Sequence, residues 1–320
     1  THRVSSKTLM RIINYARTNL KILIHAIRVS RKVNFFVFFI GGEGLLIPIL
    51  GLKLLNKKVI LMPGGVTTSV YSVKKDPLSR FLSLLTTVNF FLADWLVVYS
   101  NILVQKLGIM KHRWKIFIAH RHFVDFTKFT VIKGVDRRLN VVGYIGRLSE
   151  EKGVMNLIEA AILVLKKGTN AHFEIIGDGV LVNKIKSIIK NSYSDTHIKL
   201  IGWVPHEDIP KYLNEIKLLV LPSFTEGLPN ILLEGMACGT PVLVTPVGAI
   251  PDIIRDGETG FLLKSNDPKH IAERIVELLN KPELLEKVSV NAYNYVRENF
   301  SYEKTLEAWR RILSELESSK

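Results

Sequence analysis

The sequence predicts an α/β protein of two domains, each a doubly wound parallel β-sheet with helices between its strands. Short, uniformly apolar runs alternate along the chain with longer segments of helical periodicity, the pattern of strands buried on both faces of a sheet. The 320 residues are enough for two cores of ordinary size. An excess of lysine and arginine ends near residue 140, where a polar stretch also lies, so the domains are expected to meet there.

The first half of the chain begins with a long helix and continues with four strands. Apolar residues recur at helical spacing through residues 1–32, with arginine and lysine between them. A Pro-Gly-Gly turn ends the second strand. The expected strands are residues 34–40, 59–62, 95–99 and 115–119, and the further expected helices are residues 44–55, 78–91 and 101–108.

The second half repeats the alternation more regularly. Gly168 lies just past one periodic segment, which is a common stop signal for a helix. The expected strands are residues 141–145, 171–176, 198–200, 218–221, 242–244 and 260–263. The expected helices are residues 154–166, 181–190, 206–213, 229–237, 250–254, 268–279, 283–298 and 302–316.

The boundary between the domains is expected in the polar stretch at residues 127–140. We therefore predict a first domain over residues 1–135, a second domain over residues 136–301 and a separate C-terminal helix over residues 302–320.

Positive charge is concentrated in the first part of the chain. Residues 1–140 contain 23 lysines and arginines and five acidic residues, whereas the remainder contains 21 and 24. Such a field favours an anionic partner, namely nucleic acid, an anionic membrane or an anionic substrate; a solvated basic face without a specific partner is the alternative. No recognised nucleic-acid-binding motif accompanies the charge, so nucleic acid is not expected to be the partner.

The apolar stretches and the single cysteine indicate the cellular compartment and the relation to membranes. Residues 35–55 and 81–104 are very apolar but interrupted, so neither is expected to span a membrane, although docking on a bilayer surface stays open. Cys238 can form no disulfide within the chain, which fits a reducing, cytoplasmic compartment. No signal peptide is recognisable, and the opening Thr1-His2-Arg3 is expected to mark a fragment or processed form.

Four glycine-containing loops follow strands of the second half, at the strand ends where doubly wound sheets bind ligands. In chain order they contain Gly146-Arg147-Leu148 with Lys152-Gly153, then Gly177-Asp178-Gly179, then Gly202-Trp203-Val204, and finally Glu226-Gly227-Leu228-Pro229-Asn230.

The first and fourth loops predict a binding site for a diphosphate. Pro229 suits a first helical turn, and Gly227 and Leu228 then leave backbone N–H groups at the helix N-terminus, where phosphate binds. Arg147 and Lys152 can bring full positive charges to the same diphosphate.

Two carboxylates accompany these loops. Glu234 can accept two hydrogen bonds from a ribose diol, while Glu226 faces the sugar beyond the phosphates. Each feature alone has an ordinary alternative: loop and helix carboxylates, surface cations at a helix entry, or a plain turn. The order and spacing of all four loops favour the binding site.

On these motifs, residues 141–316 resemble the nucleotide-binding domain of the large retaining glycosyltransferase family 4. Further matching segments are Glu234-Gly235-Met236-Ala237, Gly239-Thr240-Pro241-Val242 and residues 256–262. The resemblance implies the GT-B fold, in which two Rossmann-like domains face each other across a cleft. It also implies that the last helix crosses back to the first domain, and that the first domain here lacks the family's first strand.

The resemblance assigns a role to each motif. It implies that Arg147 and Lys152 hold the donor diphosphate, that Glu226 contacts the transferred sugar, and that Glu234 holds the nucleotide ribose. It implies a catalytic set of Glu226, Arg147 and Lys152, with the base at residues 201–204, and a donor site that needs neither metal nor cofactor. The residues expected to bind the nucleotide sugar are Gly146, Gly177, Gly202, Trp203, Val204, Gly227, Leu228, Pro229, Asn230 and Glu234.

The first half matches the family less well. Residues 91–100 and 122–129 resemble family segments, but Gly64 and Gly65 stand where many members carry a histidine. His120 and His122 are candidates to replace it, and a structural or exposed role is the reading that the sequence favours for both.

The expected function is that of a cytoplasmic, retaining hexosyltransferase of polysaccharide biosynthesis, peripheral on the inner membrane face. It would move a sugar from a nucleotide-diphosphate sugar to a lipid-linked or cell-envelope glycan bound by the basic first domain. Lys53, Lys57 and Lys58 are expected to contribute to membrane binding. The alternatives are a non-catalytic GT-B protein that binds a nucleotide sugar or acts as a scaffold, and a GT-B epimerase. The sequence leaves open the base, the sugar, the acceptor and the oligomeric state.

Overall fold

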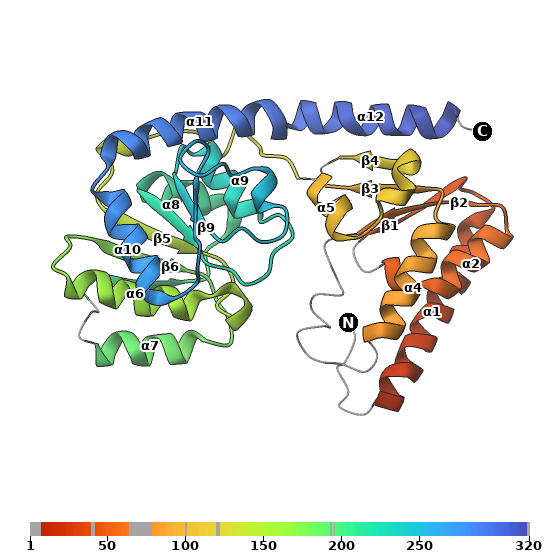
Figure 1. Cartoon of the computed structure of the whole chain (residues 1–320), viewed down its shortest axis with the longest axis horizontal. Helices are drawn as coiled ribbons and strands as arrows, with labels where there is room; N and C mark the ends of the chain where they lie inside the picture. The colour runs from red at the N-terminus through yellow and green to blue at the C-terminus, as the bar shows by residue number, and fades with distance from the viewer. Residues whose placement is uncertain are drawn as a thin grey trace. The chain divides into compact units, whose positions relative to one another are not determined.

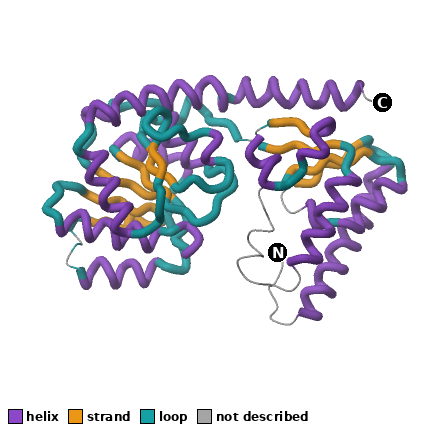
Figure 2. The backbone as a smooth tube through the Cα atoms, viewed as in Figure 1, coloured by secondary structure: helices purple, strands orange, loops and turns teal. Residues whose placement is uncertain are grey.

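The computed structural model describes residues 8–39, 42–63, 79–99, 101–119, 122–192, 194 and 196–318. The chain forms two compact units, Thr1–Ala119 and His120–Lys320. Each unit contains one parallel β-sheet with helices packed on it (Figures 1 and 2). None of the helices in these described ranges is long and apolar enough to cross a bilayer.

The first unit is built on a parallel sheet of four strands in the order β1-β2-β3-β4. The strands are β1 (Phe35–Phe39), β2 (Lys58–Met62), β3 (Trp95–Val98) and β4 (Ile116–Ile118). The helices are α1 (Thr8–Ser30), α2 (Leu46–Leu54), α4 (Ser79–Leu92) and α5 (Asn101–Lys106), with 3-10 turns η1 (Gly42–Gly44) and η2 (Met110–Lys115). Helix α2 contacts both α1 and α4, so the three lie side by side.

The second unit is built on a parallel sheet of six strands in the order β10-β9-β8-β5-β6-β7. The strands are β5 (Val141–Ile145), β6 (His172–Ile176), β7 (Ile198–Gly202), β8 (Leu218–Leu221), β9 (Val242–Val244) and β10 (Phe261–Leu262). The helices are α6 (Val154–Lys166), α7 (Val182–Asn191), α8 (Ile209–Glu215), α9 (Asn230–Ala237), α10 (Pro268–Leu279), α11 (Pro282–Phe300) and α12 (Tyr302–Ser318). The 3-10 turns are η3 (Val135–Arg137), η4 (Glu150–Lys152), η5 (His206–Asp208) and η6 (Ile250–Asp252).

The strand order of this second sheet reverses between β5 and β8. The chain runs outward from β5 through β6 to β7, then returns to the other side of β5 and runs outward again through β9 to β10. In doubly wound sheets ligands bind outside the carboxyl ends of the strands at such a reversal. A ligand-binding site is therefore expected at the loops after β5 and β8.

The bounds predicted from periodicity are close to the observed ones. The predicted strands at 141–145, 218–221 and 242–244 and the predicted helices at 154–166 and 268–279 are confirmed residue for residue. Most other bounds shift by one or two residues, and the short helix expected at 250–254 is a 3-10 turn.

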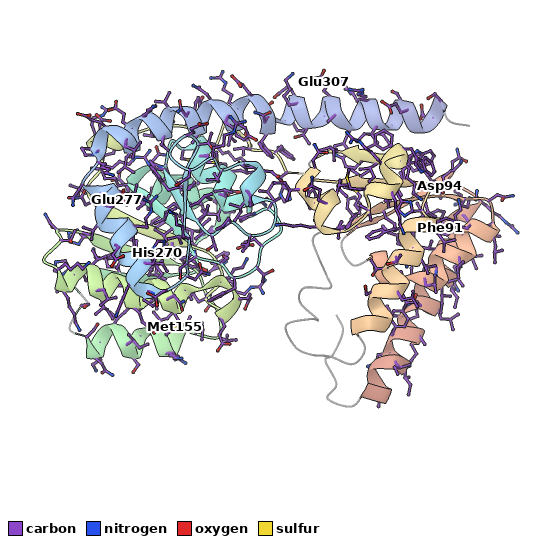
Figure 3. The ribbon with its side chains drawn as sticks, viewed as in Figure 1. Phe91, Asp94, Met155, His270, Glu277 and Glu307 are labelled. Atoms are coloured by element: carbon purple, nitrogen blue, oxygen red, sulfur yellow. The ribbon has the colours of Figure 1, made fainter. Side chains whose placement is uncertain are left out.

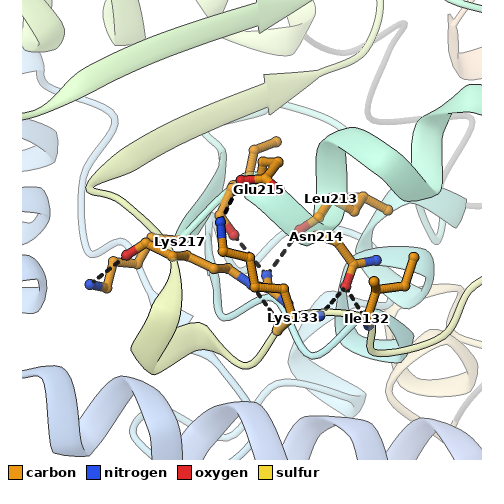
Figure 4. A network of polar contacts seen from close by, with 8 residues as sticks. Ile132, Lys133, Leu213, Asn214, Glu215 and Lys217 are labelled. Carbon is orange, nitrogen blue, oxygen red and sulfur yellow. Dashed lines mark hydrogen bonds and ion pairs between the residues drawn. The ribbon is translucent and has the colours of Figure 1, made fainter.

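Residues 122–138 pack within the second unit, although the sequence analysis placed residues up to 135 in the first domain. Val124 and Phe129 are buried in the core of the second unit, and the Val124 N–H donates to Phe300 O. Asn214 Oδ1 accepts hydrogen bonds from the backbone N–H groups of Ile132 and Lys133 (Figure 4).

Arg138 completes this attachment from a buried position. Its side chain is 2% exposed and donates to one hydroxyl and four backbone carbonyls. The five acceptors are Lys133 O, Leu213 O, Ile216 O, Cys238 O and Thr240 Oγ1. Burial lowers the pKa of Arg138 to about 10, so the guanidinium stays charged at neutral pH.

Candidate functional site

The loops after β5 and β8 bring Lys152 and Glu226 together. Lys152 Nζ lies 2.7 Å from each carboxylate oxygen of Glu226, and Ser223 Oγ donates to Glu226 Oε1 at 2.7 Å. The Glu226 side chain is only 10% exposed and that of Lys152 is 25% exposed. Two residues that the sequence analysis placed in one catalytic set thus share a half-enclosed ion pair at the point where the sheet order reverses.

A close approach of two backbones positions this pair. Gly153 has a φ of +66°, and a Cβ on it would lie 2.0 Å from Pro222 O, so only glycine fits. The Phe224 N–H donates to Glu151 O at 2.9 Å. The loop after β5 and the loop after β8 are therefore held against each other on both sides of Lys152.

Asn266 adds a second tie that the sequence analysis missed. Its Nδ2 donates to Pro222 O, and its side-chain and backbone oxygens accept from Thr245 Oγ1 and Asn156 Nδ2. Asn266 thus joins the loop of Glu226 to strand β9 and helix α6. Its position after strand β10, like the other loops, is the signal that could have indicated it.

Arg147 lies in the same loop but points elsewhere. Its side chain is 71% exposed and its Nη1 is 3.7 Å from Glu151 Oε1. The hydroxyl of Tyr144 donates to Arg147 O and fixes the backbone there. An exposed guanidinium with one weak ion pair can move to a ligand at small cost.

A cavity of about 340 Å³ brings together residues of the first three predicted loops. It is lined by Ile145, Gly146, Arg147, Ile176, Gly177, Asp178, Trp203, Val204 and Ile209. Gly177 has a φ of +138° and a Cβ on it would lie 1.9 Å from Gly146 O, which lets the first two loops touch. Gly202 O accepts from the Gly177 N–H. Trp203 is 72% exposed, so a broad aromatic surface is available at the cavity for a flat ligand.

Helix α9 begins one residue later than predicted. Pro229 precedes it in an extended conformation, with φ −74° and ψ 127°, so the first helical residue is Asn230. Within the described part of the chain no side chain caps this end. Gly227 O accepts from the Ala249 N–H, and Leu228 is buried. The first turn of α9 therefore begins beside the loop of Glu226, as an anion-binding end would require.

Glu234 is buried one turn into α9 and is bonded to His206. His206 Nε2 lies 2.9 Å from Glu234 Oε1. The ring centroids of His206 and Phe129 are 5.3 Å apart. Burial raises the pKa of Glu234, and the hydrogen bond from His206 opposes the rise. His206 was missed by the sequence analysis, although it follows the third loop directly.

A second cavity, of about 490 Å³, lies at Glu234. It is lined by His122, Phe123, Val124, Asp125, Lys128, Phe129, His206, Asn230 and Glu234. His122 Nδ1 is hydrogen-bonded to Asn230 Oδ1, so this histidine touches a predicted binding residue. His120, Gly64 and Gly65 lie outside the described residues.

The predicted residues thus form three groups on segments that follow strands β5 to β8: the Lys152–Glu226 pair, the cavity at Gly146 and Trp203, and the cavity at Glu234. Cations and an uncapped helix end are complementary to a phosphate. An aromatic surface is complementary to a base, and a buried carboxylate to a diol.

Known proteins resemble most of the second unit in sequence. Residues 125–295 match the family model described as glycosyl transferases group 1. An uncharacterized glycosyltransferase from Methanocaldococcus jannaschii is 35% identical over 174 residues, which are 54% of this chain and 47% of that protein. The capsular polysaccharide biosynthesis glycosyltransferase CapM from Staphylococcus aureus is 33% identical over 165 residues, 50% of this chain and 42% of that protein. The chain spans about half the length of the curated relatives it matches.

A solved structure extends the likeness to both units. HepE from Anabaena, crystallised in complex with UDP, aligns with a TM-score of 0.77 and 16% identity over 92% of this chain and 82% of that one. At that identity the match concerns the fold, and it confirms the predicted GT-B class of two parallel sheets with their helices.

Proposed function

The chain belongs to the glycosyl transferases group 1 family, and on that premise we propose that it is a retaining, family 4 transferase that uses a nucleotide-diphosphate sugar. The observation that carries the proposal is the Lys152–Glu226 pair beside the start of α9, at the reversal of the strand order. A diphosphate there meets Lys152 and a helix N-terminus, the exposed Arg147 can turn to it, and Glu226 is within reach of the sugar attached to it.

The proposed reaction breaks the bond between the sugar C1 and the diphosphate oxygen. An acceptor hydroxyl oxygen forms the new bond to C1 on the same face, and its proton passes to the departing phosphate. Positive charge from Arg147 and Lys152 stabilises the diphosphate as it leaves, so the donor site is proposed to work without a metal or cofactor.

The remaining groups of the site are proposed to hold the nucleoside. Trp203 and Val204 line the cavity proposed for the base, and Glu234 accepts from the ribose hydroxyls. The crystals of HepE with UDP support a nucleoside diphosphate as the ligand class.

The proposed acceptor is a lipid-linked or cell-envelope glycan. CapM, the relative named for capsular polysaccharide biosynthesis, supports this class of acceptor. A lipid-linked acceptor would hold the protein at the cytoplasmic membrane face, bound peripherally.

A screen of donors tests the proposal. The protein is incubated separately with UDP-, GDP- and ADP-sugars, with and without a lipid-linked glycan extract, and the products are identified by mass spectrometry. One donor is expected to be consumed with transfer to the glycan. Isomerised donor would indicate an epimerase, and bound but unchanged donor would indicate the non-catalytic alternative; either result would contradict the proposal.

The variant Lys152→Met is the matched test of the site. It is expected to lower kcat about 100- to 1000-fold, because one preorganised charge on the leaving diphosphate is lost. Lys167→Met, at the exposed end of α6, serves as the control and is expected to keep full activity. Full activity of Lys152→Met would remove the assigned role.

A further inference from the structure

Helices α1, α2 and α4 each turn an apolar side to solvent. Each also buries a different side in the core of the first unit, for example Ala26 on α1, Ile49 on α2 and Phe90 on α4. Ile12 and Val29 of α1 are also exposed but lie on other sides of that helix, and Met10 lies at the edge of its apolar side. The apolar residues exposed along one side of each helix are Ile13, Leu20, Ile24 and Ile27 on α1, Ile47, Leu50 and Leu54 on α2, and Leu84, Val88 and Phe91 on α4. We call these ten residues the outward face.

The spacing shows that these residues form ordered stripes. On α2 they recur at i, i+3 and i+7, on α4 at i, i+4 and i+7, and on α1 at i, i+7, i+11 and i+14, so each set shares one side of its helix. Leu54 is 85% exposed and Phe91, labelled in Figure 3, is 72% exposed. Singly scattered apolar residues are ordinary on a protein surface, but aligned stripes on three adjoining helices indicate a contact surface.

The charged residues within α1, α2 and α4 are all basic. Helices α1, α2 and α4 contain no acidic residue, and Arg17, Lys21 and Arg28 lie on the exposed surface of α1 beside its apolar stripe. Residues 1–119 contain 18 lysines and arginines against three acidic residues. Of those three, Asp94 is already paired with Lys53 and Lys58. The surface is therefore apolar with a positive border.

The lysines that the sequence analysis chose for membrane binding are engaged elsewhere. Lys53 Nζ donates to both oxygens of Asp94, at 2.8 and 2.7 Å, and Lys57 Nζ donates to Val33 O. Lys58 Nζ lies 5.2 Å from the ring centroid of Trp95. The cations of α1 are better placed to meet an anionic surface, because they border the apolar stripe.

We propose that the outward face of α1, α2 and α4 docks on the surface of an anionic lipid bilayer. The helices lie in the interface, with apolar side chains inserted between lipids and the α1 cations on the headgroups. This inference extends the proposed function and rests on it, because docking would bring the enzyme to a lipid-linked acceptor.

Charge selects the bilayer over a second copy of the chain. Two outward faces placed against each other would bring Arg17, Lys21 and Arg28 of both copies into one interface without any acidic residue from these helices. Like charges at an interface weaken association, whereas anionic headgroups pair with them.

Vesicle binding tests the inference with the full chain and no nucleotide. The protein is floated with vesicles of phosphatidylcholine alone and with vesicles of phosphatidylcholine and phosphatidylglycerol in equal amounts. Binding is expected on the anionic vesicles, with an affinity at least about tenfold above that for phosphatidylcholine and a marked decrease at high salt.

Two variants probe the apolar and the charged parts of the face. Leu54→Glu combined with Phe91→Glu, both at exposed positions, is expected to lower vesicle affinity at least about tenfold, since two inserted side chains become charged. Arg17→Glu with Lys21→Glu is expected to remove the preference for anionic lipid. Val290→Glu, on α11 of the second unit and 55% exposed, is the matched control and is expected to bind as the parent does.

The outcomes separate docking from catalysis. Circular dichroism and donor hydrolysis, which needs no membrane, are expected to be unchanged in the face variants. Vesicle affinity unchanged by either variant would overturn the inference, and so would a parent chain that dimerises through this face without binding vesicles. Vesicle binding without any sugar transfer would refute the proposed function and leave the docking surface standing.

Discussion

At the scale of single residues, the site combines one exposed cation with a mostly buried, hydrogen-bonded carboxylate. Arg147 is free to reorient, while Glu226 accepts from both Lys152 and Ser223. In the proposed reaction, a diphosphate that approaches Lys152 competes with Glu226 for the ammonium hydrogens, and the carboxylate then turns to the sugar. Burial raises the pKa of the neighbouring Tyr144, and the charges of Glu226 and Glu151 add to the rise, so the phenol stays neutral beside them.

The raised pKa of Glu234 predicts a pH dependence of nucleotide binding. In the proposed site, ribose hydroxyls donate to the ionised Glu234 carboxylate, so the affinity for a nucleoside diphosphate is expected to fall as pH is lowered through this pKa, at a higher pH than for an ordinary carboxyl group. The contribution to folding has the opposite dependence: because the pKa is raised in the folded chain, the stabilisation is complete below the unfolded pKa and is lost as pH rises through the folded one.

Calorimetric titration between about pH 5 and pH 8 checks this expectation. The Glu234→Gln variant is expected to bind the nucleoside diphosphate more weakly and to lose this pH dependence of the affinity. His206→Ala removes the hydrogen bond that lowers the pKa of Glu234, so the midpoint is expected to move to higher pH. A midpoint that His206→Ala leaves in place would show that the two side chains are not coupled.

At the scale of elements, glycines decide how closely the loops approach. Gly153 precedes α6 and Gly168 follows it, and both have left-handed backbones, with φ of +66° and +74°. They differ in their surroundings: a Cβ on Gly153 would meet Pro222 O at 2.0 Å, whereas one on Gly168 would meet nothing within 4 Å. The pair therefore separates conformational strain from loss of the loop contact.

Substitution by alanine is expected to lower the free energy of unfolding by different amounts at Gly153 and at Gly168. Gly168→Ala should lower the free energy of unfolding by about 1–2 kcal/mol, the cost of a left-handed alanine. Gly153→Ala should cost more and also lower kcat/KM, because the loop of Glu226 must move. Urea unfolding and steady-state kinetics measure both effects. Equal losses of stability, with normal kinetics for each variant, would show that the contact at Pro222 does not position the site.

At the scale of the whole molecule, the second unit contains its own core and every residue predicted for the donor. The continuous apolar cluster extends from Val124 to Phe300, and Arg138 ties the segment before β5 to the rest of that unit. The unit therefore has the interior and the hydrogen bonds that an independent domain needs.

A fragment of residues 122–318 is therefore expected to fold alone. It should unfold in one cooperative transition and bind the nucleoside diphosphate as tightly as the full chain, while it neither transfers sugar nor floats with anionic vesicles. Thermal unfolding, calorimetry and flotation measure these properties. A fragment without cooperative unfolding would show that residues 1–119 are part of the donor domain's stability.

The sequence by itself determined the elements and the four loops proposed for the donor site. Strand and helix bounds follow from apolar periodicity, which is local, so helix α6 and strand β5 were predicted residue for residue. The four loops could be chosen as candidates because ligand-binding residues of a parallel sheet follow its strands. The GT-B class followed from the same motifs by resemblance, and the fold confirms it.

Only the tertiary structure decided which residues meet. Lys152 and Glu226 lie 74 positions apart, and Arg138 bonds to carbonyls 75 to 100 positions away. Arg138 looked like a polar boundary residue and is buried, while His206 and Asn266 gained their roles from neighbours that no local pattern names. The outward face likewise needed the packing of three helices, because periodicity shows that a helix has an apolar side but only its neighbours determine whether that side is covered.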